Sequence, residues 1–412
     1  MKKIFGFMSI LVLSFVLVGC GKSNSKGNSV TLEFMTNSAS EQIDAFRKVA
    51  KEYEKQNEGV KINITGQGKD FEALIKAKMA SNDLPDMWMT HGWSVDRYSE
   101  YLEKLNSREW VSKISETALP SVINDSGDLF VLPIVVDKSG VLINQKVLDE
   151  NNINVDDLKN WEDFTKAFDK LKANNIIPVG MGGKDPRTMA HFLDALSTPM
   201  YITSKDSQKD KLIDGSFDWK NWDKINSLLL SMKENEYLNK DALTADGESI
   251  KQQMAEDKIG FWFTTNSEVS GIYEYNPEAK IGFIPLPTFS ADDSQVLVGG
   301  ERTAVGVWKD SKNKETALDF LDFMAQDENI KIIADSHGQD AAIEGVDVDL
   351  GSLSEYYEKY EDTTIEPFFD RAYLPSGMWS TLQTVGAGVL SGEITVEDGS
   401  KAMEKDYIRL RK

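Results

Sequence analysis

The stretch FVLPIVVDKSGVLIN (residues 130–144) contains two apolar runs separated by the polar group Asp137-Lys138-Ser139-Gly140. Short apolar runs bounded in this way predict buried β-strands, here over residues 130–136 and 141–144. We expect the chain to cross between two groups of elements at this point. A buried carboxylate needs partners, so Asp137 either contacts a ligand or forms a salt bridge between the two groups.

Upstream of this stretch, strand and helix patterns alternate. VTLEFM (30–35) and VKINIT (60–65) read as alternating strands, and MWM (87–89) as a short buried one. Apolar residues at helical spacing predict a helix in each gap, the first opened by a capping box of Ser38 and Glu41. The order strand–helix–strand–helix–strand indicates a parallel α/β lobe.

Downstream, a second group of apolar runs predicts further strands. These runs are IIPVG (176–180), IGFWF (259–263), KIGFIPLP (280–287) and TAVGVW (303–308). From about residue 352 onward the pattern is helical only. The sequence therefore predicts two α/β lobes between which the chain crosses more than once, and loops at the junction are the usual ligand position.

The first twenty residues have the pattern of a secretory signal. Lys2 and Lys3 precede an almost wholly apolar run over residues 4–18, which is shorter than the ~20 residues of a membrane-spanning helix. The next feature, Leu17-Val18-Gly19-Cys20, resembles the lipobox of bacterial lipoproteins. This resemblance implies that residues 1–19 are removed and that the Cys20 thiol carries a lipid. The alternatives are a buried free cysteine or an uncleaved anchor with an incidental thiol.

Residues 21–29 contain only Gly, Lys, Ser and Asn, the composition of a flexible linker. We therefore expect residues 20–29 to form a lipidated cysteine and a short linker. The folded body would lie close to the outer face of the cell membrane, in an extracytoplasmic location.

Charge and composition exclude several kinds of partner. The formal net charge is −21, and removal of residues 1–19 changes it to −23 because two lysines are lost. Nucleic acids and anionic lipid surfaces require basic patches, so we expect neither as a partner. The 412 residues and 41% hydrophobic content are sufficient for two domains.

The same composition argues against a cofactor. Cys20 is the only cysteine, so the body can form no internal disulfide and no thiolate metal site. His191 and His337 have no neighbours at metal-ligand spacing, and no GxxxxGK phosphate loop is present. We expect no metal, no cofactor and a monomeric protein.

Five segments in the expected order are similar to the extracellular solute-binding lipoproteins of bacterial ABC importers, of the maltose and multiple-sugar-binding kind. They are AKMASNDLPDMWM (77–89), LPIVVDKSGVLINQKVLDENNI (132–153), NWEDFTKAFDKLKANNIIPVGMGG (160–183), GFIPLPTF (282–289) with GGERTAVGVWKDSKNKETALDFLDFMA (299–325), and MWSTLQTVGAGVLSGEITVEDGSKAM (378–403). The resemblance implies a two-lobed, periplasmic-binding-protein-like α/β fold of type II, with a ligand cleft between lobes joined by crossing hinge segments. On this reading, lobe 1 comprises residues 30–135 and 288–337. Lobe 2 comprises residues 136–287 and 338–412.

The resemblance also implies a function. The protein would capture a carbohydrate, specifically an oligosaccharide, and deliver it to ABC permease subunits without chemical turnover. One alternative is a secreted, lipid-anchored glycoside hydrolase, which needs two carboxylates ~5–9.5 Å apart across a cleft. Another is the same binding fold with a non-sugar ligand such as a peptide or a metal chelate.

A sugar site needs aromatic rings for the apolar faces of the sugar and polar side chains for its hydroxyl groups. His91 and Trp93 follow the MWM strand at its carboxyl end, with loop packing as the alternative. Trp379 lies at the entry to a helix, where the family resemblance places a ring-stacking aromatic. We expect the tryptophans within helix or strand patterns to pack structurally, namely Trp88, Trp161, Trp219, Trp222 and Trp308.

Polar candidates follow other predicted strands. They are Asn37, Lys69, Asp137, Asp185, Arg187, Asn266, Glu301 and Arg302. Each has a structural alternative, such as opening a turn or, for Glu301 and Arg302, pairing with each other. The family often has a tryptophan shortly after the strand that corresponds to IGFWF. Here Thr264-Thr265-Asn266-Ser267 stands there instead, which leaves the role of Trp262 open.

Overall fold

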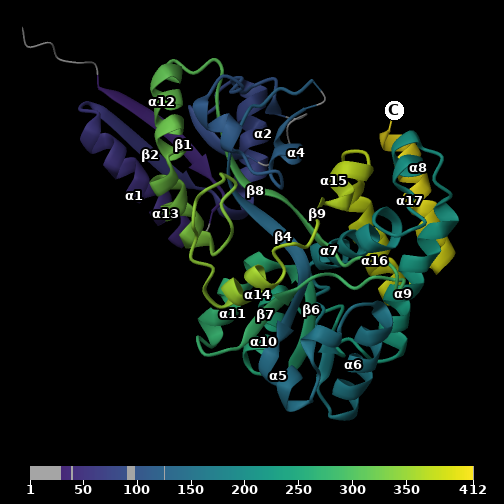
Figure 1. The fold of residues 1–412 in the computed structure, drawn as a ribbon. Coiled ribbons are helices and arrows are strands. Elements are labelled where there is room, and N and C mark those ends of the chain that lie inside the picture. The colour runs from purple at the N-terminus through teal and green to yellow at the C-terminus, as the bar shows by residue number, and fades with distance from the viewer. Residues whose placement is uncertain (1–28, 39, 91–97, 125, 412) are drawn as a thin grey trace, which may run out of the picture.

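The computed structural model describes residues 29–411 apart from residues 39, 91–97 and 125. These residues form two lobes, one at the upper left of Figure 1 and one below and to the right, with extended strands running between them. In the described ranges no helix has the length and apolar character needed to cross a membrane.

The first lobe is a parallel α/β unit. It contains β1 (Val30–Thr36), α1 (Ser40–Gln56), β2 (Val60–Gly66), α2 (Phe71–Ser81), β3 (Met87–Thr90), α4 (Leu119–Val122), α12 (Lys314–Met324) and α13 (Asp327–His337), with short turns of helix at η1 (Gly68–Asp70) and η3 (Glu109–Lys113). β1 pairs in parallel with both β2 and β3, so the predicted parallel lobe is confirmed. The capping box stays a prediction because the side chain of Glu41 lies outside the described residues.

Two long antiparallel strands belong to both lobes. β4 (Leu132–Asn144) pairs with β8 (Leu297–Val307), with Leu132 opposite Val305 at one end and Ser139 opposite Val298 at the other. The prediction of two separate strands flanking Asp137 is wrong. The polar residues remain part of one continuous strand because their backbone groups pair with β8 on one side and with β6 (Ile259–Thr265) on the other.

The second lobe contains the remaining elements. They are α5 (Gln145–Glu150), η4 (Val155–Asp157), α6 (Trp161–Ala173), β5 (Ile177–Val179), α7 (Pro186–Ser197), η5 (Thr198–Ile202), α8 (Lys209–Asp214), η6 (Trp219–Trp222), α9 (Asp223–Glu234), α10 (Gly247–Ala255), β6, η7 (Asn266–Glu268), α11 (Val269–Tyr275), β7 (Ile281–Ile284), η8 (Gly351–Leu353), α14 (Ser354–Lys359), β9 (Ile365–Pro367), α15 (Phe369–Tyr373), α16 (Met378–Ser391) and α17 (Val396–Leu410). β9 pairs in parallel with β8 at Leu297–Gly299. The expectation of helices only after residue 352 is therefore wrong.

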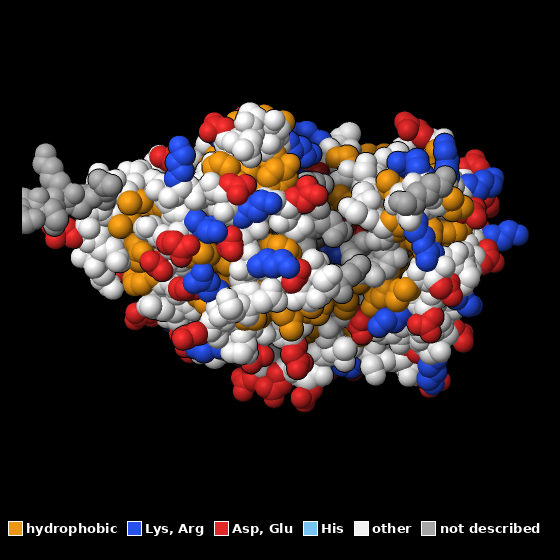
Figure 2. All heavy atoms as spheres, turned by 90° about the horizontal axis from the view of Figure 1, so that it is seen from above, with side chains coloured by type: hydrophobic (Ala, Val, Ile, Leu, Met, Phe, Trp, Pro, Cys, Tyr) orange, Lys and Arg blue, Asp and Glu red, His pale blue; other side chains and the backbone are white. Residues whose placement is uncertain are grey.

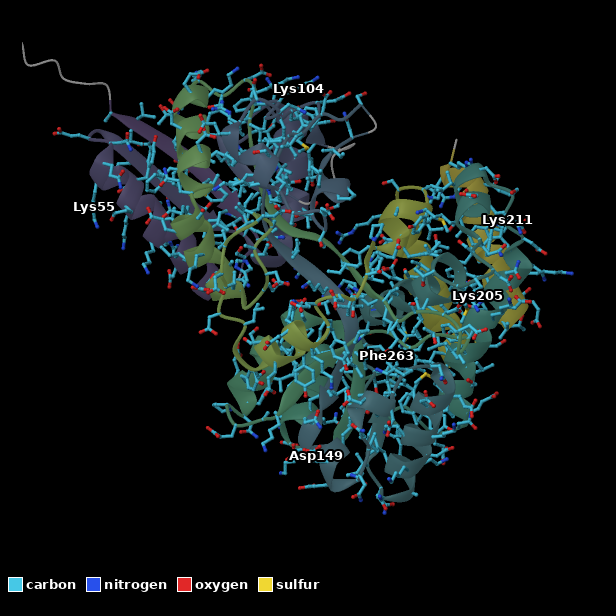
Figure 3. The ribbon with its side chains drawn as sticks, viewed as in Figure 1. Lys55, Lys104, Asp149, Lys205, Lys211 and Phe263 are labelled. Atoms are coloured by element: carbon cyan, nitrogen blue, oxygen red, sulfur yellow. The ribbon has the colours of Figure 1, made fainter. Side chains whose placement is uncertain are left out.

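The sheet of the second lobe is covered on both faces. Side chains along a strand alternate between faces, and on β6 Phe261 and Phe263 enter one core with α6 and α7 while Trp262 enters another with α10 and α11. On β4, Val141 joins the first of these cores and Leu142 the second. Figure 3 shows Phe263 in the interior of the lobe, and Trp262, only 3% exposed, is likewise a core residue.

A separate hydrophobic core fills the first lobe. It draws on β1, β3, α1, α12 and α13, and also on the first half of β4 and the last residues of β8. Each long strand thus anchors one end in each lobe, which places its middle residues at the junction.

Candidate functional site

The site lies between the lobes, where the surface is hollowed between the left and right halves of Figure 2. On the first-lobe side, β1, β2 and β3 run parallel, so their carboxyl ends meet at one edge of the sheet. Asn37 follows β1 there and is half-buried, and Lys69 follows β2 within η1. The side chain of Lys69 and the whole of His91 and Trp93 lie outside the described residues, so these three stay predictions.

Asp137 lies in the middle of β4 and is 4% exposed. Its Oδ1 accepts a hydrogen bond of 2.6 Å from the Gln339 side-chain amide, and its Oδ2 lies 3.7 Å from Nε of Arg302 on β8. Both of these partners come from other segments that cross between the lobes. The two alternatives for Asp137 are therefore compatible, because the carboxylate joins the crossing segments and still lies at the junction.

Burial raises the pKa of Asp137, and the nearby Glu268 carboxylate raises it further, while Arg302, Arg371 and the Ser267 hydroxyl partly offset this effect. A carboxylate with these partners is a strong hydrogen-bond acceptor that is only partly compensated. It suits a ligand that offers neutral hydroxyl donors.

The end of β6 brings a second polar group to the same place. Asn266 is 1% exposed, accepts a 2.9 Å hydrogen bond from the Lys138 N–H, and donates to the Tyr357 hydroxyl at 2.7 Å. Its amide is thus used for structure, whereas Glu268 two residues on is half-buried and pairs with Lys251 at 3.1 Å. Asn266 therefore supports the site from behind.

The start of α7 contributes a charged pair. The Asp185 carboxylate caps the helix by accepting the Arg187 N–H at 3.0 Å, and it also accepts the Arg187 guanidinium Nε at 2.9 Å. The hydrogen bond from Arg187 lowers the pKa of Asp185. The local Asp-Pro-Arg sequence therefore fixes a guanidinium–carboxylate pair at the start of α7.

One turn further along α7, His191 contacts Trp379. Their rings meet edge to face with 4.9 Å between centroids. Burial lowers the pKa of His191 to about 3, with further lowering by Arg302, Arg371 and Arg187, so the imidazole is neutral at physiological pH. Trp379 stands in the first turn of α16, whose start requires the left-handed backbone of Gly377 (φ 98°).

Arg371 on α15 completes the group, and sequence reasoning missed it. Its guanidinium donates to the carbonyl of Glu301 at 3.0 Å and covers the Phe368 ring at 4.3 Å. Glu301 itself is fully buried and donates its N–H to Ser121, whereas Arg302 beside it is half-exposed. The alternative in which Glu301 and Arg302 pair stays a prediction, because these two bonds of Glu301 involve its backbone and not its carboxylate.

The site combines an aromatic ring, a neutral imidazole and three arginines, of which Arg187 and Arg302 lie beside the carboxylates of Asp185 and Asp137. His191, Glu268 and Arg371 are its unpredicted members, and only their nearness in space, not a motif, reveals them. Among the described residues no group of His, Cys, Asp or Glu is arranged to hold a metal ion.

Other features lie away from this site. Trp88, Trp219 and Trp222 are buried in the cores, and Trp161 and Trp308 pack against them, so their predicted structural role is confirmed. A groove of about 990 Å³ lies in the second lobe beside β5, the end of α9 and residues 238–244. It contains none of the predicted site residues.

Comparison with known proteins decides the family. The sequence model of the bacterial extracellular solute-binding protein family matches residues 39–331 of this chain. The chain is 33% identical to the melibiose/raffinose/stachyose-binding protein MelE of Bacillus subtilis, over 98% of this chain and 96% of that protein. The chain belongs to the bacterial extracellular solute-binding protein family. The resemblance inferred from the five segments is confirmed.

Solved structures agree with this family assignment. A Bacillus subtilis binding protein in an open conformation is 32% identical, with a TM-score of 0.83 and coverage of 93% of this chain and 98% of that one. A Bacillus licheniformis sugar transporter protein in complex with stachyose is 34% identical, with a TM-score of 0.80 and coverage of 92% and 100%. The predicted two-lobed, type II fold is confirmed.

Proposed function

We propose that the protein is the extracellular solute-binding component of an ABC importer and that it captures a neutral oligosaccharide. The observation that carries this proposal is the similarity to MelE along nearly the whole chain. A relative of similar identity whose structure contains stachyose supports the same ligand class. The relatives described above are binding proteins, and we propose binding without catalysis.

The charges of the site support a neutral ligand. Arg187 is paired with Asp185, Arg302 lies beside Asp137, and Arg371 interacts electrostatically with the Asp370 carboxylate, whose pKa it lowers. An anion-binding site would present guanidinium groups with free charge. Compensated guanidinium groups beside Trp379 instead suit hydroxyl groups and the apolar face of a sugar.

The proposed mechanism is closure around the ligand. Asn37, Lys69, His91 and Trp93 would contact the sugar from the first lobe, and Asp185, Arg187 and Trp379 from the second. Residues held by the crossing segments, Asp137, Asn266, Glu301 and Arg302, would lie between them. A ligand that contacts both lobes favours the closed arrangement by its differential affinity for it. The closed form would then dock on the permease.

The membrane anchor and the lobe boundaries are further parts of the proposal. Cys20 would carry the lipid, and the mature protein would act as a monomer on the outer face of the membrane. Residues 1–28 lie outside the described residues. The division into residues 30–135 with 288–337 and 136–287 with 338–412 also stays a prediction.

A ligand screen tests the proposed function. The mature protein would be heated with raffinose, stachyose, melibiose, maltose or a uronic-acid oligomer, and each sugar would be analysed for cleavage. A ligand at 100 times its Kd stabilises the folded state by about 2.7 kcal/mol, so we expect a raised Tm with neutral oligosaccharides and no hydrolysis. Cleavage of a sugar, or a Tm raised by no carbohydrate, would contradict the proposal.

The anchor is tested separately in a bacterial host. We expect a labelled fatty acid to be incorporated into the native protein and not into Cys20→Ser. Equal labelling of both proteins would overturn the lipid anchor without affecting the proposed ligand.

A further inference from the structure

Asp137 and Lys138 are neighbours on β4, and their side chains point to opposite faces of the strand. Asp137 contacts Gln339, and Lys138 contacts Asp340 with 2.5 Å between Nζ and Oδ2. Two consecutive residues of β4 are thus paired with two consecutive residues of the segment that leaves α13. The backbone supports this pairing, since the Val136 N–H donates to the Asp340 carbonyl at 3.0 Å.

Behind the strand, Lys138 is enclosed by a group that we call the hinge clasp, formed by Lys138, Asn266, Asp340 and Tyr357. The ammonium lies 4.0 Å from the centroid of the Tyr357 ring, and the Tyr357 hydroxyl accepts from Asn266, which in turn accepts the Lys138 N–H. The Lys138 side chain is only 13% exposed. The Tyr357 ring, the Asp340 carboxylate and the Asn266 amide therefore hold Lys138, and with it this point of β4, in place.

The clasp and the ligand-facing residues are held by the same backbone. Asn266 is in the clasp, and the hydroxyl of the next residue, Ser267, lowers the pKa of Asp137 on the other face. Opposite them, Asp137 and Lys138 pair with Gly300 and Gly299 of β8. Movement of Lys138 would therefore turn the peptide that orients the Asp137 carboxylate.

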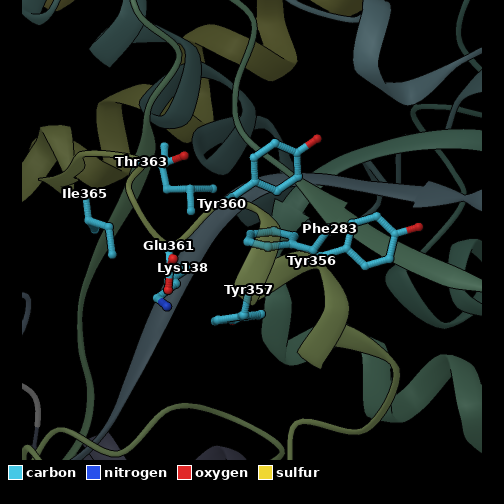
Figure 4. Close-up of a pocket in the computed structure, with 9 residues that line it drawn as sticks. Lys138, Phe283, Tyr356, Tyr357, Tyr360, Glu361, Thr363 and Ile365 are labelled. Atoms are coloured by element: carbon cyan, nitrogen blue, oxygen red, sulfur yellow. The ribbon is translucent and has the colours of Figure 1, made fainter.

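A pocket of about 50 Å³ lies beside the clasp and gives its side chains room to adjust. Figure 4 shows the rings of Phe283, Tyr356, Tyr357 and Tyr360 gathered on one side of it and Thr363 and Ile365 on the other. The clasp thus lies against an incompletely filled space rather than inside a fully packed core, and its geometry depends on its polar contacts.

From this arrangement we infer that Lys138 is a positioning residue for sugar binding: through the hinge clasp it orients Asp137 toward the ligand from the opposite face of the strand. The inference rests on the proposed function. It assigns a role in ligand affinity to a side chain that does not face the ligand. Removal of its charge lowers affinity by misplacing Asp137.

The test uses the mature protein and calorimetric titration with raffinose and stachyose. We expect Lys138→Met, which keeps the length of the side chain, to raise the Kd about tenfold, and Lys138→Arg to restore it to within about threefold. Lys146→Met is the control, because Lys146, in the first turn of α5 just beyond β4, forms an ion pair of similar length, 2.6 Å, with Asp257 away from the clasp. It should leave the Kd unchanged.

A double variant distinguishes positioning from a general structural effect. If Lys138 acts through Asp137, Lys138→Met should add little to the loss already caused by Asp137→Asn. Fully multiplicative losses, an unchanged Kd in Lys138→Met, or equal losses in Lys138→Met and Lys146→Met would each overturn the inference. If the unaltered protein remains folded but binds neither sugar, the proposed ligand class is wrong, and the inference about Lys138 is wrong with it. This outcome is distinguishable from the three above, which concern only the variants.

Discussion

His191 on α7 meets the indole of Trp379 on α16 edge to face, with 4.9 Å between the ring centroids and 76° between the ring planes. The edge of one ring then lies against the electron-rich face of another, an arrangement that fixes ring orientation. Because α7 and α16 pack together in one core, the indole is held by rigid elements. The ring orientation of Trp379, the stacking residue proposed above, is thus fixed by α7 and α16.

Trp379→Ala should therefore weaken oligosaccharide binding strongly. We expect a rise in Kd of tenfold or more, since loss of a ring contact costs ~1.4 kcal/mol or more. Trp379→Phe keeps a flat apolar surface and should lose less. Calorimetric titration with raffinose or stachyose measures both, and equal Kd values for all three proteins would remove Trp379 from the site.

Asp137→Asn should weaken binding without destabilising the fold. The amide oxygen can still accept from Gln339, and burial already disfavours the charged form of Asp137. What is lost is one of the two carboxyl oxygens that would accept hydrogen bonds from sugar hydroxyl groups, for which we expect about a tenfold rise in Kd. Measurement of both Tm and Kd distinguishes a ligand contact from a structural role. A lower Tm with an unchanged Kd would mean that Asp137 serves the structure alone.

Much of this arrangement could be predicted from the sequence because single residues carry clear signals. Asp137 stands out locally because it interrupts an apolar stretch, whereas Trp379, at the entry to a helix, is indicated by the family resemblance. The parallel strands of the first lobe have regular alternation. Local patterns were sufficient for Asp137 and for these strands.

Features created by distant contacts could not be predicted. β9 is a three-residue strand, Ile365–Pro367, that exists only because β8 offers it an edge. Arg371 has no motif, and its helix is oriented by Asp194, which accepts the Asp370 N–H at 2.7 Å across 176 residues of sequence. Such positions depend on the assembled fold rather than on periodicity or spacing.

A buried histidine should make stability depend on pH. Burial lowers the pKa of His337 in the first lobe to about 4, and its ring Nδ1 lies 2.8 Å from the Ile333 carbonyl. The unfolded state, with a pKa near 6.5, binds more protons between these values. Stability should therefore fall as pH drops from 6.5 toward 4, by about 1–2 kcal/mol between pH 7 and pH 5 for this group.

The variant His337→Asn isolates this contribution, because asparagine can still donate to the carbonyl but does not titrate. Urea unfolding of both proteins at pH 7 and pH 5 gives two differences in unfolding free energy. We expect the advantage of the native protein over the variant to shrink at pH 5. A difference that is the same at both pH values would contradict the lowered pKa.

Asp185→Asn should change which ligands are accepted. The carboxylate of Asp185 compensates the Arg187 guanidinium through two side-chain hydrogen bonds of 2.9 and 3.0 Å. Asparagine caps a helix about as well as aspartate, so α7 should be preserved. The guanidinium, however, would lose its charged partner and become available to an anion.

We therefore expect Asp185→Asn to bind neutral oligosaccharides with a Kd within about threefold of the native value. Its affinity for a uronic-acid oligomer should rise roughly tenfold, because Arg187 forms one new ion pair with that ligand in a partly exposed site. Titration at low and at 0.5 M salt would separate the effects, because an ionic gain is screened and a hydroxyl contact is not. The double variant Asp185→Asn/Arg187→Gln is the control and should lose the gain. If the single variant gains nothing for the anionic sugar, compensation of Arg187 is not what makes this site select neutral ligands.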